Sequence, residues 1–484
     1  MRTSFFFLVL FCCVAVGLVA AGCGKESDSR KEVTPEKIAP VPSPTVAKSA
    51  RELRMKVDLD ALPADDLPAA VKMIREAQQW ADRKDALARP APGDATDMLP
   101  YMTLKMNDAV LEETFALGRG FMLKSQRAAG NFGYMYDWLK KEWVPGDSQV
   151  RQAGSLWGLA LCHRHRPNDQ TEAALQKGFS FWLDQTIEGP VPGTLLVRYG
   201  NDPKVSTGTV ALVALAIVEY LKTDTPIPAA RRQMLTEKLE GFLKYLVWTQ
   251  RDNGLFADSY TPATKTRSSG SSPYYDGETL LCLCKAARQL GYDFLVPVIE
   301  KAARATANTY LVQAWKARKD MTLTKGFYQW GSMSFLEYFL AGWKEADLYA
   351  DVTLTLGWWM MHVHETLDRG RNHAYAVEGL VSAYAIAKER GDILAMTDLL
   401  YVIDRSLYKL TAWQIGGPLV HANPFLSAHP TDDPAAIGGI MNAARAWPGR
   451  PRHPGDTQHE LRIDVTQHQM HAVILAMEHV YGVR

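Results

Sequence analysis

Residues 205–221, VSTGTVALVALAIVEYL, join a small and polar start to a run that is apolar on every side. A helix that is apolar all round is buried inside a larger assembly. Five further stretches share this construction: VRQAGSLWGLAL from Val150, YYDGETLLCLCKAA from Tyr274, YQWGSMSFLEYFLAG from Tyr328, NHAYAVEGLVSAYAIA from Asn372 and DVTQHQMHAVILAMEHV from Asp464. The chain therefore repeats one kind of buried helix six times.

One-sided helices separate these six stretches. Glu172–Trp182, Ala229–Thr249 and Val296–Ala317 each place apolar residues on one face and polar residues on the other. Buried helices that alternate with one-sided helices suit a two-layer ring, because an outer helix is covered on a single face. We therefore predict an all-α domain of about six helical hairpins over residues 101–484, preceded by a short helical lead-in over residues 61–100.

A second repeat lies where helices end. QRAAGNF at 126–132 and QRDNGLF at 250–256 each follow a helix and lead into an aromatic segment. With the sixfold spacing, these segments resemble the α/α toroid superfamily of six-hairpin glycosidases, polysaccharide lyases, sugar epimerases and terpenoid cyclases. The resemblance spans about residues 105–482. Phe132 and Phe256 stand where a cyclase usually carries Trp, and no DxDD motif is present, so the resemblance favours the sugar-processing members.

The first 22 residues have the pattern of a targeting segment. Arg2 precedes an apolar run from Phe5 to Ala21, which ends in Ala20-Ala21-Gly22-Cys23. This resembles a bacterial lipoprotein signal, which implies cleavage before Cys23 and lipidation of that cysteine. An uncleaved anchor or an ordinary secretory peptide is the alternative. Residues 23–60, rich in Pro, Ser and Lys, then form a flexible, lipid-anchored linker.

The same resemblance implies a location. Gly24 follows Cys23 where lipoproteins retained in the inner membrane carry Asp. We expect the protein in the bacterial cell envelope, anchored to the outer membrane on its periplasmic or surface face.

The overall composition excludes several functions. Of the 484 residues, 47% are hydrophobic and 22% charged, which is typical of a folded protein. Lys and Arg total 54 against 53 Asp and Glu, so the net charge gives no reason to expect nucleic-acid binding. Phosphate-binding loops and nucleotide fingerprints are missing from the sequence, and we expect no cofactor and no metal. The sequence leaves the oligomeric state open.

In an α/α toroid the inner helices run parallel, so the resemblance implies that their N-terminal residues meet at one mouth. The mixture of aromatic, amide and charged groups there suits a saccharide, because sugar rings stack on aromatic faces and hydroxyls take paired donors and acceptors. We predict substrate binding by Arg151, Gln152, Tyr275, Glu278, Gln329, Trp330, Asn372, Tyr375, Arg462 and Asp464.

Four residues are candidate catalysts: Asp276, Glu378, His373 and His468. Glu378 lies about two turns into an apolar helix, where a carboxylate must be paired or functional. Its structural alternative is a buried pair with Arg371 or Arg151. Asp276 can instead cap its helix, and Asp464 with Gln467 fits a capping box.

Two reaction types remain open. A glycoside hydrolase needs two carboxyl groups beside the scissile bond, for which Asp276 and Glu378 are candidates. A uronic-acid lyase or C5-epimerase needs His or Tyr to remove a proton, with Arg151 or Arg462 neutralising the substrate. The larger number of acids favours an oligo- or polysaccharide hydrolase. A noncatalytic lipoprotein that binds glycan or protein is the third possibility.

Overall fold

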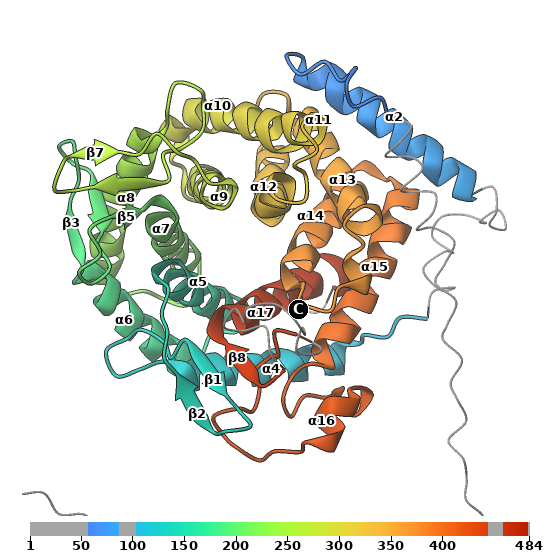
Figure 1. Ribbon diagram of the computed structural model, residues 1–484. Helices are drawn as coiled ribbons and strands as arrows, with labels where there is room; N and C mark the ends of the chain where they lie inside the picture. The colour runs from blue at the N-terminus through green and yellow to red at the C-terminus, as the bar shows by residue number, and fades with distance from the viewer. Residues whose placement is uncertain (1–56, 87–102, 444–457, 483–484) are drawn as a thin grey trace, which may run out of the picture. The chain divides into compact units, whose positions relative to one another are not determined.

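The computed structural model describes residues 57–86, 103–443 and 458–482, and all statements below concern these residues. The predicted signal peptide, Cys23 and nearly all of the predicted linker lie outside them. Helices dominate, which confirms the predicted all-α class (Figure 1). None of the described helices is both long and apolar enough to span a membrane.

Six helices form an inner ring (Figure 1). All six predicted repeats lie in it, and each of its helices contacts the next, the last packing against the first. Their sequences explain the arrangement, because every residue of Thr207–Leu221 is buried. In ring order the inner helices are α5 (Gln149–His165), α7 (Thr207–Leu221), α9 (Pro273–Leu290), α12 (Leu323–Leu340), α14 (Ala374–Arg390) and α17 (Ile463–Ala476).

A second layer of helices surrounds the ring and alternates with it along the chain. Its helices are α4 (Asp108–Ser125), α6 (Asp169–Leu183), α8 (Ala229–Thr249), α10 (Val296–Ala307), α13 (Ala346–His362) and α15 (Ile393–Thr411). Helix α8 buries one face, with regularly spaced Leu235, Leu239, Phe242 and Leu246. Helix α13 differs, because α2 (Leu67–Ala86) packs on it and residues 352–360 are all buried.

Short elements complete the described fold. The strands form three small antiparallel sheets, ordered β2-β1-β8, β3-β4 and β5-β6-β7. Strands β5 and β8 run directly into α7 and α17, so they fix where these inner helices begin. The strands are β1 (Met135–Asp137), β2 (Glu142–Val144), β3 (Thr186–Glu188), β4 (Leu195–Val197), β5 (Val205–Ser206), β6 (Ser259–Thr261), β7 (Thr266–Arg267) and β8 (Glu460–Arg462). The short helices are η2 (Asp293–Leu295), η3 (Asn308–Gln313), α11 (Ala314–Lys316), η4 (Thr366–Asp368), η5 (Val420–Ala422), α16 (Pro424–Ala428) and η6 (Met477–Tyr481).

The Gln that begins each Gln-Arg-x-x-Gly-x-Phe segment links neighbouring outer helices by hydrogen bonds. Gln126 donates from Nε2 to the carbonyl oxygens of Gly130, in its own loop, and Ala174, in α6. Gln250 does the same with Gly254 and Val298 in α10. Gln414 is a third copy, which links Gly438 to Thr114 in α4. The repeat is therefore a structural device that ties the end of one outer helix to another.

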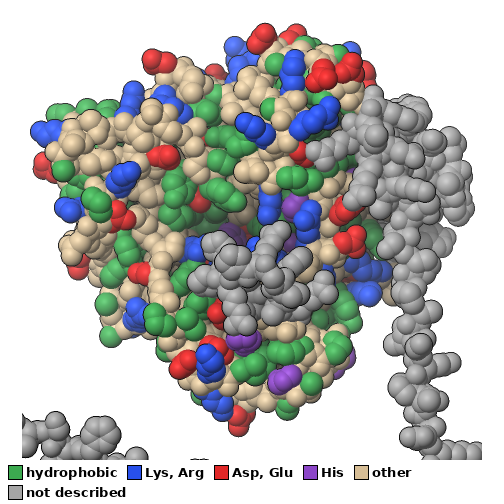
Figure 2. Space-filling model, in the orientation of Figure 1, with side chains coloured by type: hydrophobic (Ala, Val, Ile, Leu, Met, Phe, Trp, Pro, Cys, Tyr) green, Lys and Arg blue, Asp and Glu red, His purple; other side chains and the backbone are tan. Residues whose placement is uncertain are grey.

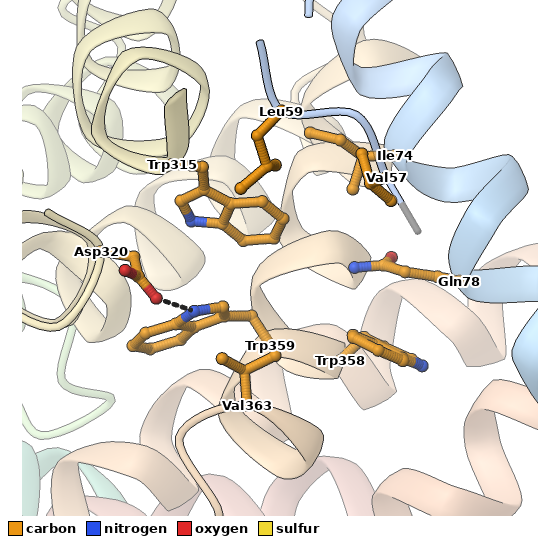
Figure 3. Close-up of a pocket in the computed structure, with 9 residues that line it drawn as sticks. All are labelled: Val57, Leu59, Ile74, Gln78, Trp315, Asp320, Trp358, Trp359 and Val363. Carbon is orange, nitrogen blue, oxygen red and sulfur yellow. Dashed lines mark hydrogen bonds between the residues drawn. The ribbon is translucent and has the colours of Figure 1, made fainter. Parts of the chain in front are cut away.

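The segment predicted as a helical lead-in contains α2 (Leu67–Ala86), which packs on α13. Figure 3 shows Ile74 from this segment facing Trp315 and Trp359 across a small apolar pocket, together with Val57 and Leu59. Val57 and Leu59 belong to the predicted linker 23–60, so the described end of that linker is packed instead of flexible. The Nε2 of Gln78 donates to the Thr355 carbonyl in α13. The lead-in is thus packed against the outer layer.

Charged residues occupy the other end of the inner helices, where their C-terminal turns meet. Glu219 in α7 is fully buried, and its carboxylate contacts Lys285 Nζ at 2.5 Å and Arg164 Nε at 2.9 Å. Burial raises the pKa of Glu219, but Lys285 and Arg164 outweigh burial and hold it at about 2. Three inner helices are therefore joined by one buried carboxylate.

Candidate active site

A cavity of about 520 Å³ opens at the N-terminal ends of the inner helices. This volume lies in the range of small-molecule sites. Figure 2 looks at this face, where Lys, Arg and His side chains surround a central hollow. The lining residues are Ser148, Val150, Arg151, Gly154, Leu212, Tyr274, Tyr275, Glu278, Lys325, Gln329, Trp330, Asn372, Tyr375, Asn442, Arg462, Asp464, Val465, Gln467 and His468.

His468, in α17, pairs with the buried carboxylate of Glu378 in α14. The Nδ1 of His468 lies 3.0 Å from Oε1 of Glu378, and Nδ1 of His471 lies 3.0 Å from the same oxygen. Burial lowers the pKa of His468, but the charges of Glu378 and Asp464 outweigh it and shift the pKa upward. Since Nδ1 is occupied, Nε2 is the nitrogen that His468 can offer to a ligand in the cavity.

Glu278, in α9, is the cavity's protonated carboxyl group. Burial raises its pKa to about 8, and the nearby His468 opposes this only in part. Its Oε2 has no hydrogen-bond partner in the described parts of the chain. A Cβ at Gly208 in α7 would lie 2.2 Å from that oxygen, so only glycine leaves room for the carboxyl. Glu278 therefore holds a proton near neutral pH and presents it in a space shaped for it.

Asp464 is the second cavity carboxyl, and its state is opposite. Arg462 donates to it from Nε at 3.0 Å and from Nη2, and Arg151 Nε lies 3.3 Å away. Burial raises the pKa of Asp464, but Arg462 outweighs burial and the pKa falls below its ordinary value. Asp464 is thus an ionised group held between two guanidinium groups.

Two buried amide groups can donate to a ligand in the cavity. Gln329 is 7% exposed and Gln467 is 1% exposed, and both line the cavity. Within the described residues, the Nε2 of each has no hydrogen-bond partner, like Oε2 of Glu278. Because unpaired buried polar groups cost about 1–3 kcal/mol each, a ligand that pairs them gains that energy.

Comparison with known proteins identifies the fold. No protein-family model and no curated protein matches this sequence. Among solved structures, the cellobiose 2-epimerase of Bacillus thermoamylovorans has a TM-score of 0.52 at 10% identity, covering 76% of this chain and 99% of its own. A D-mannose isomerase has a TM-score of 0.50 at 13% identity, covering 80% and 100%. A GH76 α-mannanase of Bacteroides thetaiotaomicron has a TM-score of 0.50 at 10% identity, covering 76% and 95%.

The fold is the α/α toroid. Identities this low establish the architecture only, so the activity must be argued from the cavity. The mouth of the toroid brings together ten of the predicted residues: Arg151, Tyr275, Glu278, Gln329, Trp330, Asn372, Tyr375, Arg462, Asp464 and His468.

Asp276 requires a correction, because it lies on the other side of α9. Its Oδ1 accepts the backbone N–H of Phe256 at 2.7 Å and its Oδ2 accepts the hydroxyl of Tyr310, so it binds the outer layer of the toroid. The predicted binding residue Gln152 requires the same correction. Its Oε1 accepts the backbone N–H of Phe132 at 2.8 Å, and its Nε2 donates to the Phe132 carbonyl at 2.9 Å. Both residues stand 20 positions after their partner, so they fill equivalent structural places.

His373 and Glu378 also differ from expectation. His373 is fully buried beside the Arg371 carbonyl, outside the cavity lining, and burial lowers its pKa to about 3. Glu378 pairs with His468 and His471 instead of an arginine, so it acts behind the cavity. Asp464 does not cap α17, because its oxygens bind Arg462 and Arg151.

Other lining residues were missed as binding residues, notably Tyr274, Lys325 and Asn442. Lys325 and Asn442 lie outside the six repeated stretches, so the repeat gave no signal for them. Gln467, at the same helix start as Asp464 and His468, also lines the cavity. Among the described residues, no group of three His, Cys, Asp or Glu side chains could hold a metal ion.

We expect the substitution Asp276→Asn to change stability more than catalysis. Burial raises the pKa of Asp276 to about 7, so the folded state holds this proton more tightly than the unfolded state. Wild type should therefore lose stability as pH rises from about 4 to about 7, by roughly 1–4 kcal/mol. Urea unfolding across this range should show a smaller loss for Asp276→Asn. If turnover of the Asp276→Asn variant falls more than tenfold, Asp276 is a catalytic residue and this prediction is wrong.

Proposed function

We propose that this toroid is a sugar-transforming enzyme in which His468 and Glu278 transfer protons at opposite sides of the bound sugar. One observation carries the proposal: Glu278 and His468 both line the cavity, and their helices α9 and α17 lie three places apart in the ring of six inner helices (Figure 1). Each side chain is held in a distinct protonation environment.

The roles follow from the hydrogen bonds. His468 Nε2 removes a proton from the sugar carbon beside a carbonyl or carboxylate, and Glu378 stabilises the imidazolium that forms. The electron pair moves onto the oxygen of that group, where the amide of Gln329 donates. Glu278 gives its proton to the opposite face of the carbon, which inverts the configuration. Return of the proton to the former carbonyl carbon, with transfer of the neighbouring hydroxyl proton to the former carbonyl oxygen, would give isomerisation.

Two features support a sugar as substrate. Tyr275, Trp330 and Tyr375 line the cavity beside amides and charged groups, which is the mixture that binds sugar rings and hydroxyls. Two of the similar structures are described as a D-mannose isomerase and a cellobiose 2-epimerase, whose names denote reactions on sugars without hydrolysis. We therefore propose epimerisation or isomerisation as the reaction, with uronate lysis as an alternative that uses the same proton abstraction.

Glycoside hydrolysis is the second candidate, with different residues from those expected. Glu278 and Asp464 are two cavity carboxyl groups whose pKa values are shifted in opposite directions. Such a pair suits a general acid and an ionised partner. The GH76 α-mannanase among the similar structures favours the same reading. Asp464 is already held by Arg462 and Arg151, which makes it a weak base.

The decisive experiment is incubation of the protein with sugars in D₂O. Proton abstraction predicts deuterium at the carbon beside the carbonyl or carboxylate, seen by NMR, together with a changed configuration. Hydrolysis predicts new reducing ends and no deuterium at that carbon. Incorporation of deuterium that is unchanged by His468→Gln would contradict the assigned base.

The pH dependence gives a separate check. Glu278 donates only while protonated, so kcat/KM should fall as pH rises through about 8. His468 must be neutral to act as base, so kcat/KM should also fall as pH drops below the raised pKa of His468. Glu278→Gln should lower activity and remove the alkaline limb. An alkaline limb that persists in this variant would assign it to another group.

We further propose that Cys23 anchors the protein to the outer membrane through lipid. The small residues before it and Gly24 after it support this placement. In a bacterial host, Cys23→Ser should leave the protein in the soluble envelope fraction, whereas wild type should sediment with outer membranes and take up labelled fatty acid. Labelling of the Cys23→Ser variant would contradict the assignment.

A further inference from the structure

Lys325 is a cavity cation without a carboxylate partner. It lies in the first turn of α12, lines the cavity, and contacts the ring of Tyr375 with its Nζ 5.9 Å from the centroid. Among the described residues, no carboxylate pairs with it. Burial lowers the pKa of Lys325, and its charged neighbours Arg369 and Arg371 lower it further. The charge of Lys325 is therefore uncompensated where a ligand would bind.

The charges of the described lining residues have the same sign. The cations Arg151, Lys325 and Arg462 line the cavity, and Asp464 is the ionised carboxylate among these described residues. Asp464 binds both arginines, whereas no described carboxylate pairs with Lys325. The chain as a whole has a formal net charge of only +1, so this excess is local. An excess of positive charge in a concave site concentrates anions.

Gln329 adds an unpaired donor beside Lys325. The two residues are four apart on α12, so they share one face of the helix. Gln329 is 7% exposed, and no described residue forms a hydrogen bond with its Nε2. An ammonium and an amide N–H on one face can together bind two oxygens of an acidic group. The N-terminal ends of the inner helices, which meet at this mouth, favour negative charge as well.

We infer that the cavity selects an anionic sugar, whose carboxylate or phosphate group binds Lys325 and Gln329 on α12. This inference rests on the proposed function, because it names the substrate class of the same site. The acidic group lies on the α12 side of the cavity, and the reacting carbon lies between His468 and Glu278. For a carboxylate ligand, the positive charges also stabilise the negative charge that develops when the neighbouring proton leaves.

Calorimetric titration of the His468→Gln variant tests whether the cavity selects acidic sugars. This variant is used so that ligand binding is measured without turnover. The ligands are the uronates of glucose, galactose and mannose, the corresponding hexose 6-phosphates and the neutral parent hexoses. At least one acidic ligand should bind ten times more tightly than its parent hexose, and its affinity should fall as NaCl is raised. Uronates and phosphates together distinguish the two acidic groups.

Substitutions assign the preference to its residues. Lys325→Met should weaken the acidic ligand at least tenfold and leave the neutral hexose unchanged, whereas Lys325→Arg should retain most of the preference. Gln329→Glu should weaken the acidic ligand through repulsion. Lys244→Met, on the exposed side of outer helix α8, removes the same charge far from the mouth and should change nothing.

Three outcomes would overturn the inference: no binding of any acidic ligand, equal binding of acidic and neutral sugars, or an unchanged preference in Lys325→Met. The proposed chemistry fails separately. Selective binding of an acidic sugar without deuterium exchange would refute the proton-transfer proposal alone. Deuterium exchange on neutral sugars, combined with equal binding of acidic and neutral sugars, would refute the inference of an acidic ligand and leave the proton-transfer proposal intact.

Discussion

Replacement of His468 by Gln is expected to lower kcat/KM by about 10²–10⁴-fold, because a positioned base contributes that factor. Gln keeps a polar side chain of similar reach but cannot accept and release the proton. Steady-state kinetics on the sugar identified by deuterium exchange measures the effect. His421→Gln is the matched control, since His421 is exposed in η5 and does not line the cavity.

Glu378→Gln separates positioning from catalysis. Glu378 touches no ligand in this scheme and acts only by holding His468. Without its charge the pKa of His468 should fall, so the acidic limb of the pH profile should move to lower pH while kcat decreases. A merely structural role would lower stability and leave the limb in place. An unchanged profile in an active Glu378→Gln variant would contradict the assigned role.

The second large effect concerns stability. Glu219→Gln should lower the free energy of unfolding by about 3 kcal/mol, because it removes the fully buried carboxylate that pairs with both Lys285 and Arg164. Lys285 keeps a longer contact with Glu337 at 3.7 Å, and the half-buried Arg164 keeps Glu478 at 3.3 Å. Urea unfolding at neutral pH measures this change in stability. The low pKa of Glu219 predicts that wild type keeps this contribution until the pH falls below about 4.5 and loses it progressively towards pH 2.

Glu389→Gln is the control for Glu219, because Glu389 is exposed at the end of α14. It removes one carboxylate charge and should change stability by less than about 0.5 kcal/mol. A Glu219→Gln variant as stable as Glu389→Gln would mean that the cations find water or other partners. In that case the carboxylate would not hold the three inner helices together.

The ring could be predicted from the sequence because its signal is local. A helix such as Thr207–Leu221, apolar on every side, requires cover on every side, and six of them can cover one another only in a closed layer. The gathering of their N-terminal residues was implied by the resemblance to the α/α toroid, in which the inner helices run parallel. Arg151, Glu278 and His468 were therefore placed at one mouth without knowledge of any distance.

The choice between Asp276 and Glu278 failed for a reason that the sequence contains. Residues two apart on a helix point about 200° apart, so only one of them can face the cavity. Asp276 stands 20 positions after Phe256, as Gln152 stands 20 after Phe132, and this shared spacing identifies the residue that binds the outer layer. The cavity residue is then Glu278.

The partner of Glu378 could not be predicted in this way. His468 is 90 residues away in the sequence, and only the packing of α14 against α17 brings the two together. The same limit applies to Lys325 and Asn442, which reach the cavity from outside the repeated stretches. Long-range pairings depend on the three-dimensional arrangement, which periodicity does not encode.

Closure of the ring by α17 has a consequence for biosynthesis. This helix follows the others in the chain, and it packs between α5 and α14 while contacting α4. Until the ribosome has released it, the nascent chain exposes apolar flanks of α5 and α14, which invite aggregation or chaperone capture. Because α17 also carries His468, a chain arrested before this helix would lack both part of its core and its proposed proton acceptor.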